Sequence, residues 1–234
     1  MNNPQSAPFP HREGKTIVIT GATGALGRKA AYVFAEMGHN LALLDNDAMK
    51  LDSLVKELNL PPDRLFASVV DLRDGQAVQD SAEAVSAKFG FVHALIHLVG
   101  GWVGGKSLPE TSADDLTFML NQHVWTTFHL FRAFAPKLAA AGWGRVIAVS
   151  ASTVANPPGK SGAYTAAKAA QENLVLTLAA ELKEHGVTAN IIQVRAIDVE
   201  NKGAGTTPDV IVAAMQYLFS EQAAKVNGAR IPLY

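Results

Sequence analysis

The chain has 234 residues, of which 48% are hydrophobic and 18% are charged, enough for one globular domain with a large core. A net charge of -1 excludes a general electrostatic attraction to nucleic acid or to anionic membranes, and no apolar run reaches the roughly 18 residues of a membrane helix. The absence of cysteine excludes disulfides, thiolate nucleophiles and cysteine-ligated zinc, and it fits a cytoplasmic location.

The first residues differ in character from the rest. Residues 1–15 are rich in proline, asparagine and serine and contain no hydrophobic stretch, so we expect a flexible arm and not a signal peptide. We expect residues 16–234 to form a single domain.

A β-branched run at residues 16–20 predicts a buried strand, and a glycine-rich turn follows it directly. An amphipathic helix then runs to Gly38. Strand, glycine turn and helix together are typical of a dinucleotide site, where the backbone approaches the pyrophosphate and the helix N-terminus offers free N–H groups. The alternative is that the glycines only make a tight turn. The turn residues expected to bind a dinucleotide are Gly21, Thr23, Gly24, Ala25, Leu26 and Gly27.

The second predicted strand, residues 40–44, ends in Asp45. A carboxylate at this position accepts hydrogen bonds from the adenosine ribose hydroxyls and repels a 2′-phosphate, so it favours NAD(H) over NADP(H). The alternative is a structural role, because Asp45 or Asp47 could cap the helix predicted at residues 48–59.

Two further strands are predicted at residues 64–70 and 93–98, with a helix at 75–89 between them. The alternation of strands and helices predicts an α/β fold, a doubly wound parallel sheet of seven strands with helices on both faces. The strand at 93–98 opens into a loop of four glycines around Trp102. Such a loop is either a ligand site or a flexible segment with Trp102 folded onto the core.

A long helix is predicted over residues 112–141, with Asn121 inside it. Its expected apolar stripe is Leu120, Val124, Phe128, Phe131, Ala135 and Leu138. Strands at 144–149, 188–194 and 229–232 and a helix at 208–219 complete the expected elements.

Tyr164 and Lys168 lie four residues apart in a predicted helix that ends before Gly186, so they share one face. A lysine ammonium one turn away stabilises a phenolate and lowers the pKa of the phenol, which makes the tyrosine a usable general acid or base. The alternative is an ordinary surface pair on an alanine-rich helix. The histidines show no spacing that indicates a metal site.

These motifs, taken together and in this order, resemble the short-chain dehydrogenase/reductase family, which has a Rossmann fold. The resemblance implies that Tyr164 donates the proton as hydride arrives, that Lys168 binds the nicotinamide ribose and lowers the tyrosine pKa, and that Asn121 holds a water. It also implies cofactor contacts beyond the glycine turn, made by Asp45, Asp71, Leu72, Val99 and Gly100.

The chain departs from the family pattern at several positions. Ala151 stands where the family has its catalytic serine, and the flanking Ser150 and Ser152 are kept as candidate catalytic residues. The usual Asn-Asn-Ala-Gly is replaced at residues 97–100, and Arg195-Ala196 replaces Pro-Gly, with little substrate-covering segment after it. Trp102 and Ser152 are the expected substrate contacts.

Some of these departures are shared with the dihydropteridine reductase branch of the family, notably the Gly-Gly-Trp loop and the alanine in place of serine. The sequence therefore predicts an NAD(H)-dependent oxidoreductase acting on a carbonyl, an alcohol or an activated C=N substrate. A dihydropteridine reductase-like enzyme and a non-catalytic NAD(H)-binding sensor or scaffold are the alternatives. Apolar residues on several faces of the two long helices predict a homodimer or homotetramer.

Overall fold

The computed structural model of the protein describes residues 14–234. The expected arm at residues 1–15 therefore lies almost wholly outside the described residues. Within that part, no helix combines the length and apolarity that a membrane span requires.

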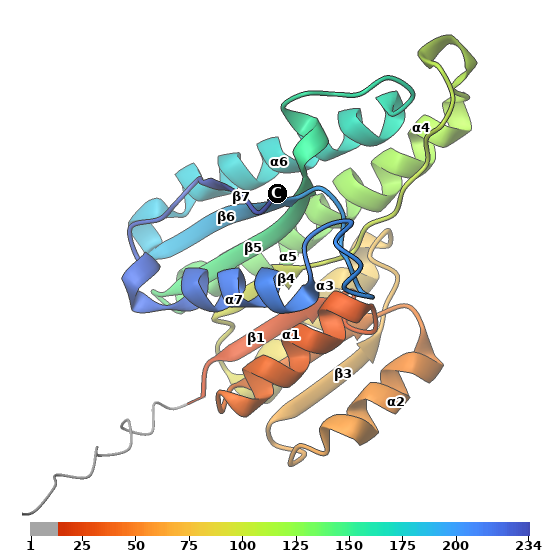
Figure 1. Ribbon diagram of the computed structural model, residues 1–234. Helices are drawn as coiled ribbons and strands as arrows, with labels where there is room; N and C mark the ends of the chain where they lie inside the picture. Colours follow the sequence, from red (N-terminus) through yellow and green to blue (C-terminus); the bar gives the residue numbers. More distant parts are fainter. Residues whose placement is uncertain (1–13) are drawn as a thin grey trace, which may run out of the picture.

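A seven-stranded parallel sheet forms the centre of the molecule, as expected from the sequence (Figure 1). Its strand order is β3-β2-β1-β4-β5-β6-β7. Every neighbouring pair of strands is parallel, from β3 with β2 at one edge to β6 with β7 at the other. The strands are β1 (Thr16–Thr20), β2 (Asn40–Asp45), β3 (Leu65–Val69), β4 (Ala94–His97), β5 (Gly144–Ala151), β6 (Val187–Val194) and β7 (Arg230–Pro232).

Helices cover both faces of the sheet. Helices α1, α2 and α7 pack on one face, and α3, α5 and α6 pack on the other, each layer with its own apolar cluster (Figure 1). The α-helices are α1 (Ala25–Glu36), α2 (Ala48–Leu58), α3 (Gly75–Phe89), α4 (Ala113–Leu120), α5 (Thr126–Ala140), α6 (Gly162–Glu181) and α7 (Pro208–Phe219). Single turns lie at η1 (Leu108–Glu110), η2 (Asn121–Trp125), η3 (Ser152–Val154), η4 (Lys183–His185) and η5 (Glu221–Ala223).

The central strands are buried on both faces, which explains their continuous apolar sequences. Ile17, Val18 and Ile19 of β1 are fully buried, and all eight residues of β6 are buried. Because the strands are parallel, their carboxyl ends meet at one edge, and this edge receives the glycine turn, Asp45 and the Trp102 loop.

The helix predicted over residues 112–141 is divided by a π-helical turn, η2, at Asn121–Trp125. One extra residue in that turn rotates the following helix by roughly 100°. Most of the expected apolar stripe is buried or packs against the core, including Leu120 and Val124. Phe128 is the exception: it is 38% exposed, whereas Leu130 is fully buried. The π turn is not visible in the hydrophobic periodicity, because the buried positions there include polar residues.

Candidate active site

The glycine turn between β1 and α1 leaves an open helix N-terminus. Gly21 has a positive φ of 68°, and the N–H of Gly24 donates to the carbonyl of Gly21 at 3.2 Å. A side chain at Gly27 would place its Cβ 2.1 Å from that same carbonyl oxygen. Gly24 is the N-cap of α1 and has no side chain to cap it. The first N–H groups of α1 are thus available to an anionic group such as a pyrophosphate.

Asp45 joins the end of β2 to this turn. It is only 9% exposed, and its carboxylate accepts hydrogen bonds from the N–H of Thr23 at 2.9 Å and the N–H of Asp47 at 3.1 Å. The cap of α2 is Asp47, which accepts from the N–H of Lys50 at 3.1 Å. The capping alternative therefore belongs to Asp47, while Asp45 faces the glycine turn.

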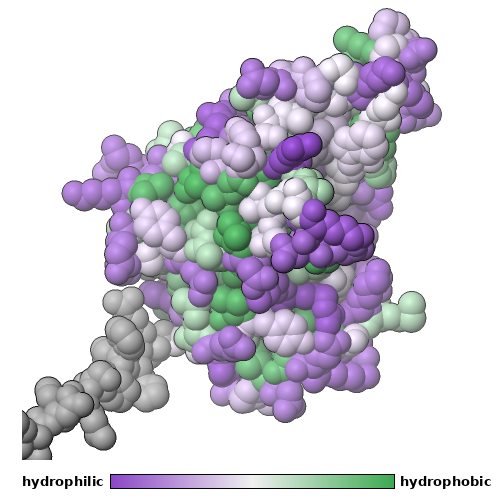
Figure 2. All heavy atoms as spheres, viewed as in Figure 1, coloured by the Kyte–Doolittle hydropathy of each residue, from purple (hydrophilic) through white to green (hydrophobic). Residues whose placement is uncertain are grey.

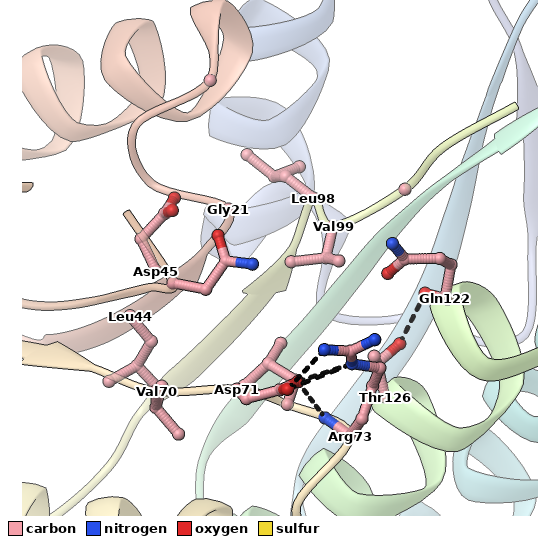
Figure 3. Close-up of a pocket in the computed structure, with 14 residues that line it drawn as sticks. Gly21, Leu44, Asp45, Val70, Asp71, Arg73, Leu98, Val99, Gln122 and Thr126 are labelled. Carbon is pink, nitrogen blue, oxygen red and sulfur yellow. Dashed lines mark hydrogen bonds and ion pairs between the residues drawn. The ribbon is translucent and has the colours of Figure 1, made fainter. Parts of the chain in front are cut away.

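A pocket of about 320 Å³ opens at this edge, within the size range of small-molecule sites (Figure 3). The sequence-predicted cofactor residues that line it are Gly21, Gly24, Asp45, Asp71, Leu72, Val99 and Gly100. Sequence reasoning missed the others, which are Leu44, Asn46, Val70, Arg73, Leu98, Gln122 and Thr126. Most of these are immediate neighbours of predicted residues, so their position at strand ends could have indicated them.

Asp71 and Arg73 form a bidentate ion pair inside this pocket (Figure 3). The Arg73 Nε donates to Oδ1 at 2.9 Å and Nη2 donates to Oδ2 at 2.6 Å. The hydrogen bond with Arg73 holds the pKa of the Asp71 carboxyl below its usual range. The Arg73 guanidinium is therefore already paired with the Asp71 carboxylate.

Tyr164 and Lys168 lie one turn apart on α6, next to the carboxyl end of β5. Lys168 is 6% exposed, and its Nζ donates to the Val149 carbonyl and to Oε1 of Gln171, both at 2.9 Å. Burial lowers the pKa of Lys168 to about 8, and the charge of Glu172 opposes this shift.

The expected lowering of the tyrosine pKa is not found in this arrangement. Burial raises the pKa of the half-buried Tyr164 above its ordinary value. The physical reason is that the Lys168 ammonium is directed to Val149 and Gln171 and makes no hydrogen bond to the phenol.

Asn121 begins the π-helical turn and is half-buried, and its side chain makes no hydrogen bond within residues 14–234. Turns of this kind are frequent at functional sites.

The structure separates the candidates around the missing serine. Ala151 is the last residue of β5 and is 4% exposed. The Ser150 hydroxyl is enclosed and has no hydrogen-bond partner among the described residues, so Ser150 is corrected from a candidate catalytic residue to a buried residue of β5. Ser152 is half-buried in η3. Trp102 is 64% exposed, so it is not folded onto the core.

Two buried histidines were not expected at the site. His97 at the end of β4 shares a 2.8 Å hydrogen bond between its Nδ1 and the Thr20 hydroxyl, and His123 Nε2 lies 3.0 Å from the Gly101 carbonyl. Burial lowers the pKa of each to about 3, so both are neutral at pH 7. Facing a carbonyl, His123 Nε2 must carry the proton. No group of three potential metal ligands occurs in residues 14–234.

Comparison with known proteins identifies the family. The short chain dehydrogenase model matches residues 15–207. The chain belongs to the short-chain dehydrogenase family. It is 29% identical to the 2,3-dihydroxy-2,3-dihydro-p-cumate dehydrogenase of Pseudomonas putida F1, covering 80% of this chain and 73% of that protein. It is 26% identical to the 7alpha-hydroxysteroid dehydrogenase of Escherichia coli, covering 88% and 80%.

Solved structures of this family share the fold. The chain superposes with a TM-score of 0.86 on an NADH complex of the 3-ketoacyl-(acyl-carrier-protein) reductase of Brucella melitensis, at 22% identity, covering 94% and 97% of the two chains. It superposes equally well, at 0.86 and 24% identity, on an NADPH-bound short chain oxidoreductase of Pseudomonas aeruginosa PAO1, covering 93% and 94%. These structures show the shared fold, while the family match and the named relatives make the protein a short-chain oxidoreductase, of a family that binds nicotinamide cofactors.

The site residues of this short-chain oxidoreductase fit such a cofactor. The open N-terminus of α1, the closely packed Gly27 and the pocket from Asp45 to Gly100 form a cradle for a dinucleotide.

Proposed function

We propose that the protein is an NAD(H)-dependent oxidoreductase in which Tyr164 exchanges a proton with the substrate and Lys168 assists it. The observation that carries the proposal is the pair on α6: a half-buried phenol lies one turn before a buried ammonium whose pKa burial lowers to about 8. An ionisable group tuned toward neutrality beside a phenol suits acid–base chemistry at physiological pH.

When bound, the nicotinamide ring supplies or accepts the hydride. In the reductive direction, Tyr164 donates its phenolic proton to the substrate oxygen or nitrogen, and the phenolate then recovers a proton from solvent. The positive charge of Lys168 stabilises that phenolate. Lys168 has three N–H donors and uses two on Val149 and Gln171, which leaves one for the cofactor ribose. In this scheme Asn121 holds a water that connects the site to solvent.

NADH is the proposed cofactor because, within residues 14–234, Arg73 is the one cationic residue that lines the pocket, and it is already paired with a carboxylate. Asp45 places a carboxylate there, and the guanidinium of Arg73 is bonded to Asp71. The test is the ratio of kcat/KM with NADH to that with NADPH. Asp45→Asn keeps the size of the side chain and should reduce this ratio; a wild-type preference for NADPH would contradict the cofactor assignment.

A pterin-reducing enzyme is the second candidate. The exposed indole of Trp102, in the loop after β4, offers a surface on which a flat substrate could stack. The absence of a serine hydroxyl at position 151 suits an activated acceptor that needs fewer donors. The absence of a serine hydroxyl at position 151 also favours a non-catalytic NAD(H) sensor.

The deciding experiment measures NADH oxidation against quinonoid dihydropterin, quinones, diketones and simple ketones, for wild type and Tyr164→Phe. Turnover that Tyr164→Phe abolishes supports the proposal, and turnover of the pterin alone selects the second candidate. Tight NADH binding without turnover on any acceptor, or full turnover by Tyr164→Phe, would overturn it.

A further inference from the structure

A chain of buried hydrogen bonds leads from Lys168 into the π-helical turn. Lys168 Nζ donates to Gln171 Oε1 at 2.9 Å, Gln171 Nε2 donates to the Thr127 hydroxyl at 3.0 Å, and that hydroxyl donates to the His123 carbonyl at 2.6 Å. Gln171 is 1% exposed and Thr127 is fully buried. Solvent does not compete for any of these bonds, so each group depends on the next.

This series of hydrogen bonds determines which end of the Gln171 amide faces Lys168. A threonine hydroxyl has a single proton, and Thr127 gives it to the His123 carbonyl. The hydroxyl can then only accept from Gln171, which must present its NH₂ group to Thr127. The amide oxygen is thereby turned toward Lys168, whose ammonium can only donate.

The far end of this series of hydrogen bonds, at His123, reaches the substrate side of the site. The protonated Nε2 of His123 donates to the carbonyl of Gly101, in the loop that carries Trp102. The His123 ring also meets the ring of Tyr164 edge to face, with 5.7 Å between the centroids. The same turn thus contacts the loop, the tyrosine and, through Thr127 and Gln171, the lysine.

We propose that Gln171 is a positioning residue that keeps the buried Lys168 ammonium charged and directed into the site, and that Thr127 holds Gln171 in this orientation. A buried ammonium is costly unless oxygen acceptors surround it, and Gln171 is one of the two it has within residues 14–234. A directly bonded carboxylate would cancel the positive charge that a phenolate at Tyr164 needs, whereas a neutral amide does not. The nearby Glu172 carboxylate also favours the charged lysine, but it is bonded to Gln193 and Arg230. His97 and His123, the other titratable groups beside Lys168, are neutral at pH 7. The role of Lys168 in catalysis rests on the proposed function.

The first test follows Lys168 itself, without cofactor or substrate. The titration of the lysine side chain is recorded by NMR of the Cε carbons, with the Lys168 signal assigned from its loss in Lys168→Met. Methionine is similar in length to glutamine but has no amide and therefore no acceptor oxygen for the ammonium. In Gln171→Met the Lys168 titration should therefore move to lower pH than in wild type. Thr127→Val should shift it in the same direction, and Thr127→Ser, which keeps the hydroxyl, should restore the wild-type titration.

The second test uses the pH profile of turnover. Because activity needs the charged lysine, the alkaline limb of kcat should move to lower pH in Gln171→Met, with kcat near pH 8 reduced about tenfold, the factor expected for one hydrogen bond to a charged group. The KM of the carbonyl substrate should change little. Asn190→Leu is the matched control: it removes a buried amide with two hydrogen bonds on β6, to Val226 and from Ala229, and should affect stability alone.

The outcomes separate this inference from the proposed function. If Tyr164→Phe abolishes turnover but Gln171→Met leaves both the Lys168 titration and the alkaline limb unchanged, Gln171 is only structural and the inference is wrong. If Tyr164→Phe is fully active, the proposed function fails, while the lysine titration still decides the role of Gln171. Should Gln171→Met not fold, Thr127→Val and Thr127→Ser give the same comparison.

Discussion

At the scale of single residues, the site differs from its family most at Ala151. A serine hydroxyl there would add one donor toward a developing oxyanion, and such a donor can contribute roughly 3 kcal/mol to the transition state. Ala151 ends β5 with its side chain buried, and the neighbouring Ser150 hydroxyl is enclosed. The serine candidate that remains beside Ala151 is Ser152, which is half-buried in η3.

We predict that Ala151→Ser raises kcat/KM for simple ketones at least tenfold, because it restores that donor. The measurement is steady-state NADH oxidation with a ketone series. Ser150→Ala serves as the control and should change nothing, since its hydroxyl reaches no solvent. A wild-type enzyme that already reduces simple ketones rapidly would contradict this prediction.

At the scale of elements, the turn from β1 into α1 depends on close backbone packing. A Cβ at Gly27 would lie 2.1 Å from the Gly21 carbonyl oxygen and 2.8 Å from the Ala22 Cα, both backbone atoms that cannot move aside. Gly27→Ala should therefore lower the free energy of unfolding by about 1–3 kcal/mol and weaken NADH binding, measured by urea unfolding and fluorescence titration. Gly24→Ala meets Gly21 only at 3.5 Å, so it should be far milder; equal losses in both variants would argue against a packing cause.

The same elements show which parts of the fold could be predicted from the sequence. Strand β1 and helices α3 and α7 match their predicted bounds, because periodicity and caps such as Asp74 are local signals. For the same reason the sequence could predict several residues at strand ends that line the pocket of Figure 3. The π turn, the chain through Gln171 and the enclosed Ser150 could not, because each depends on which side chains meet after α5 and α6 pack together. The stripe of α6 likewise includes buried Lys168, Gln171 and Glu172, which hydrophobic patterning cannot indicate.

At the scale of the whole molecule, buried neutral histidines link stability to pH. Burial lowers the pKa of His97 and His123 to about 3 and that of His39 to about 4. An unfolded chain protonates its histidines near pH 6.5, so it binds more protons than the folded chain below that pH. The stabilisation is complete above about pH 6.5 and is lost progressively as the pH falls to the folded-state pKa, about 4 for His39 and about 3 for His97 and His123.

We predict that the free energy of unfolding decreases from pH 7 to pH 5 by up to about 1.4 kcal/mol per pH unit for each such histidine. Urea unfolding at several pH values measures it. His97→Gln should reduce the slope, and His185→Gln, a change at an exposed position, should not. An unchanged slope in His97→Gln would contradict the assignment.

The exposed apolar residues concern the assembly of the molecule, and we propose that it is a homodimer or homotetramer. One group follows the helical segment from α4 to α5, where Phe118, Trp125 and Phe128 are 42%, 49% and 38% exposed, and the last two rings pack together at 5.8 Å. A second group lies on α7, where Val210 and Tyr217 are 50% and 49% exposed. Figure 2 shows hydrophobic residues gathered on the face of the molecule that carries α7. Large exposed aromatic groups of this kind mark contact surfaces.

We therefore expect light scattering during size exclusion to give at least twice the 24.8 kDa chain mass for wild type. The double variant Trp125→Glu and Phe128→Glu places two like charges on the first surface, so it should halve that mass by opposing self-association across it. Tyr217→Glu applies the same change on α7 and should halve the mass only if that face also forms an interface in a tetramer. A monomeric wild type would contradict the assembly, and a double variant with unchanged mass would show that the interface is not at the α4–α5 surface.

The same helical segment also contributes to the pocket, which Gln122 and Thr126 line. Loss of the dimer should therefore weaken NADH binding as well. Fluorescence titration at matched protein concentrations would measure this change.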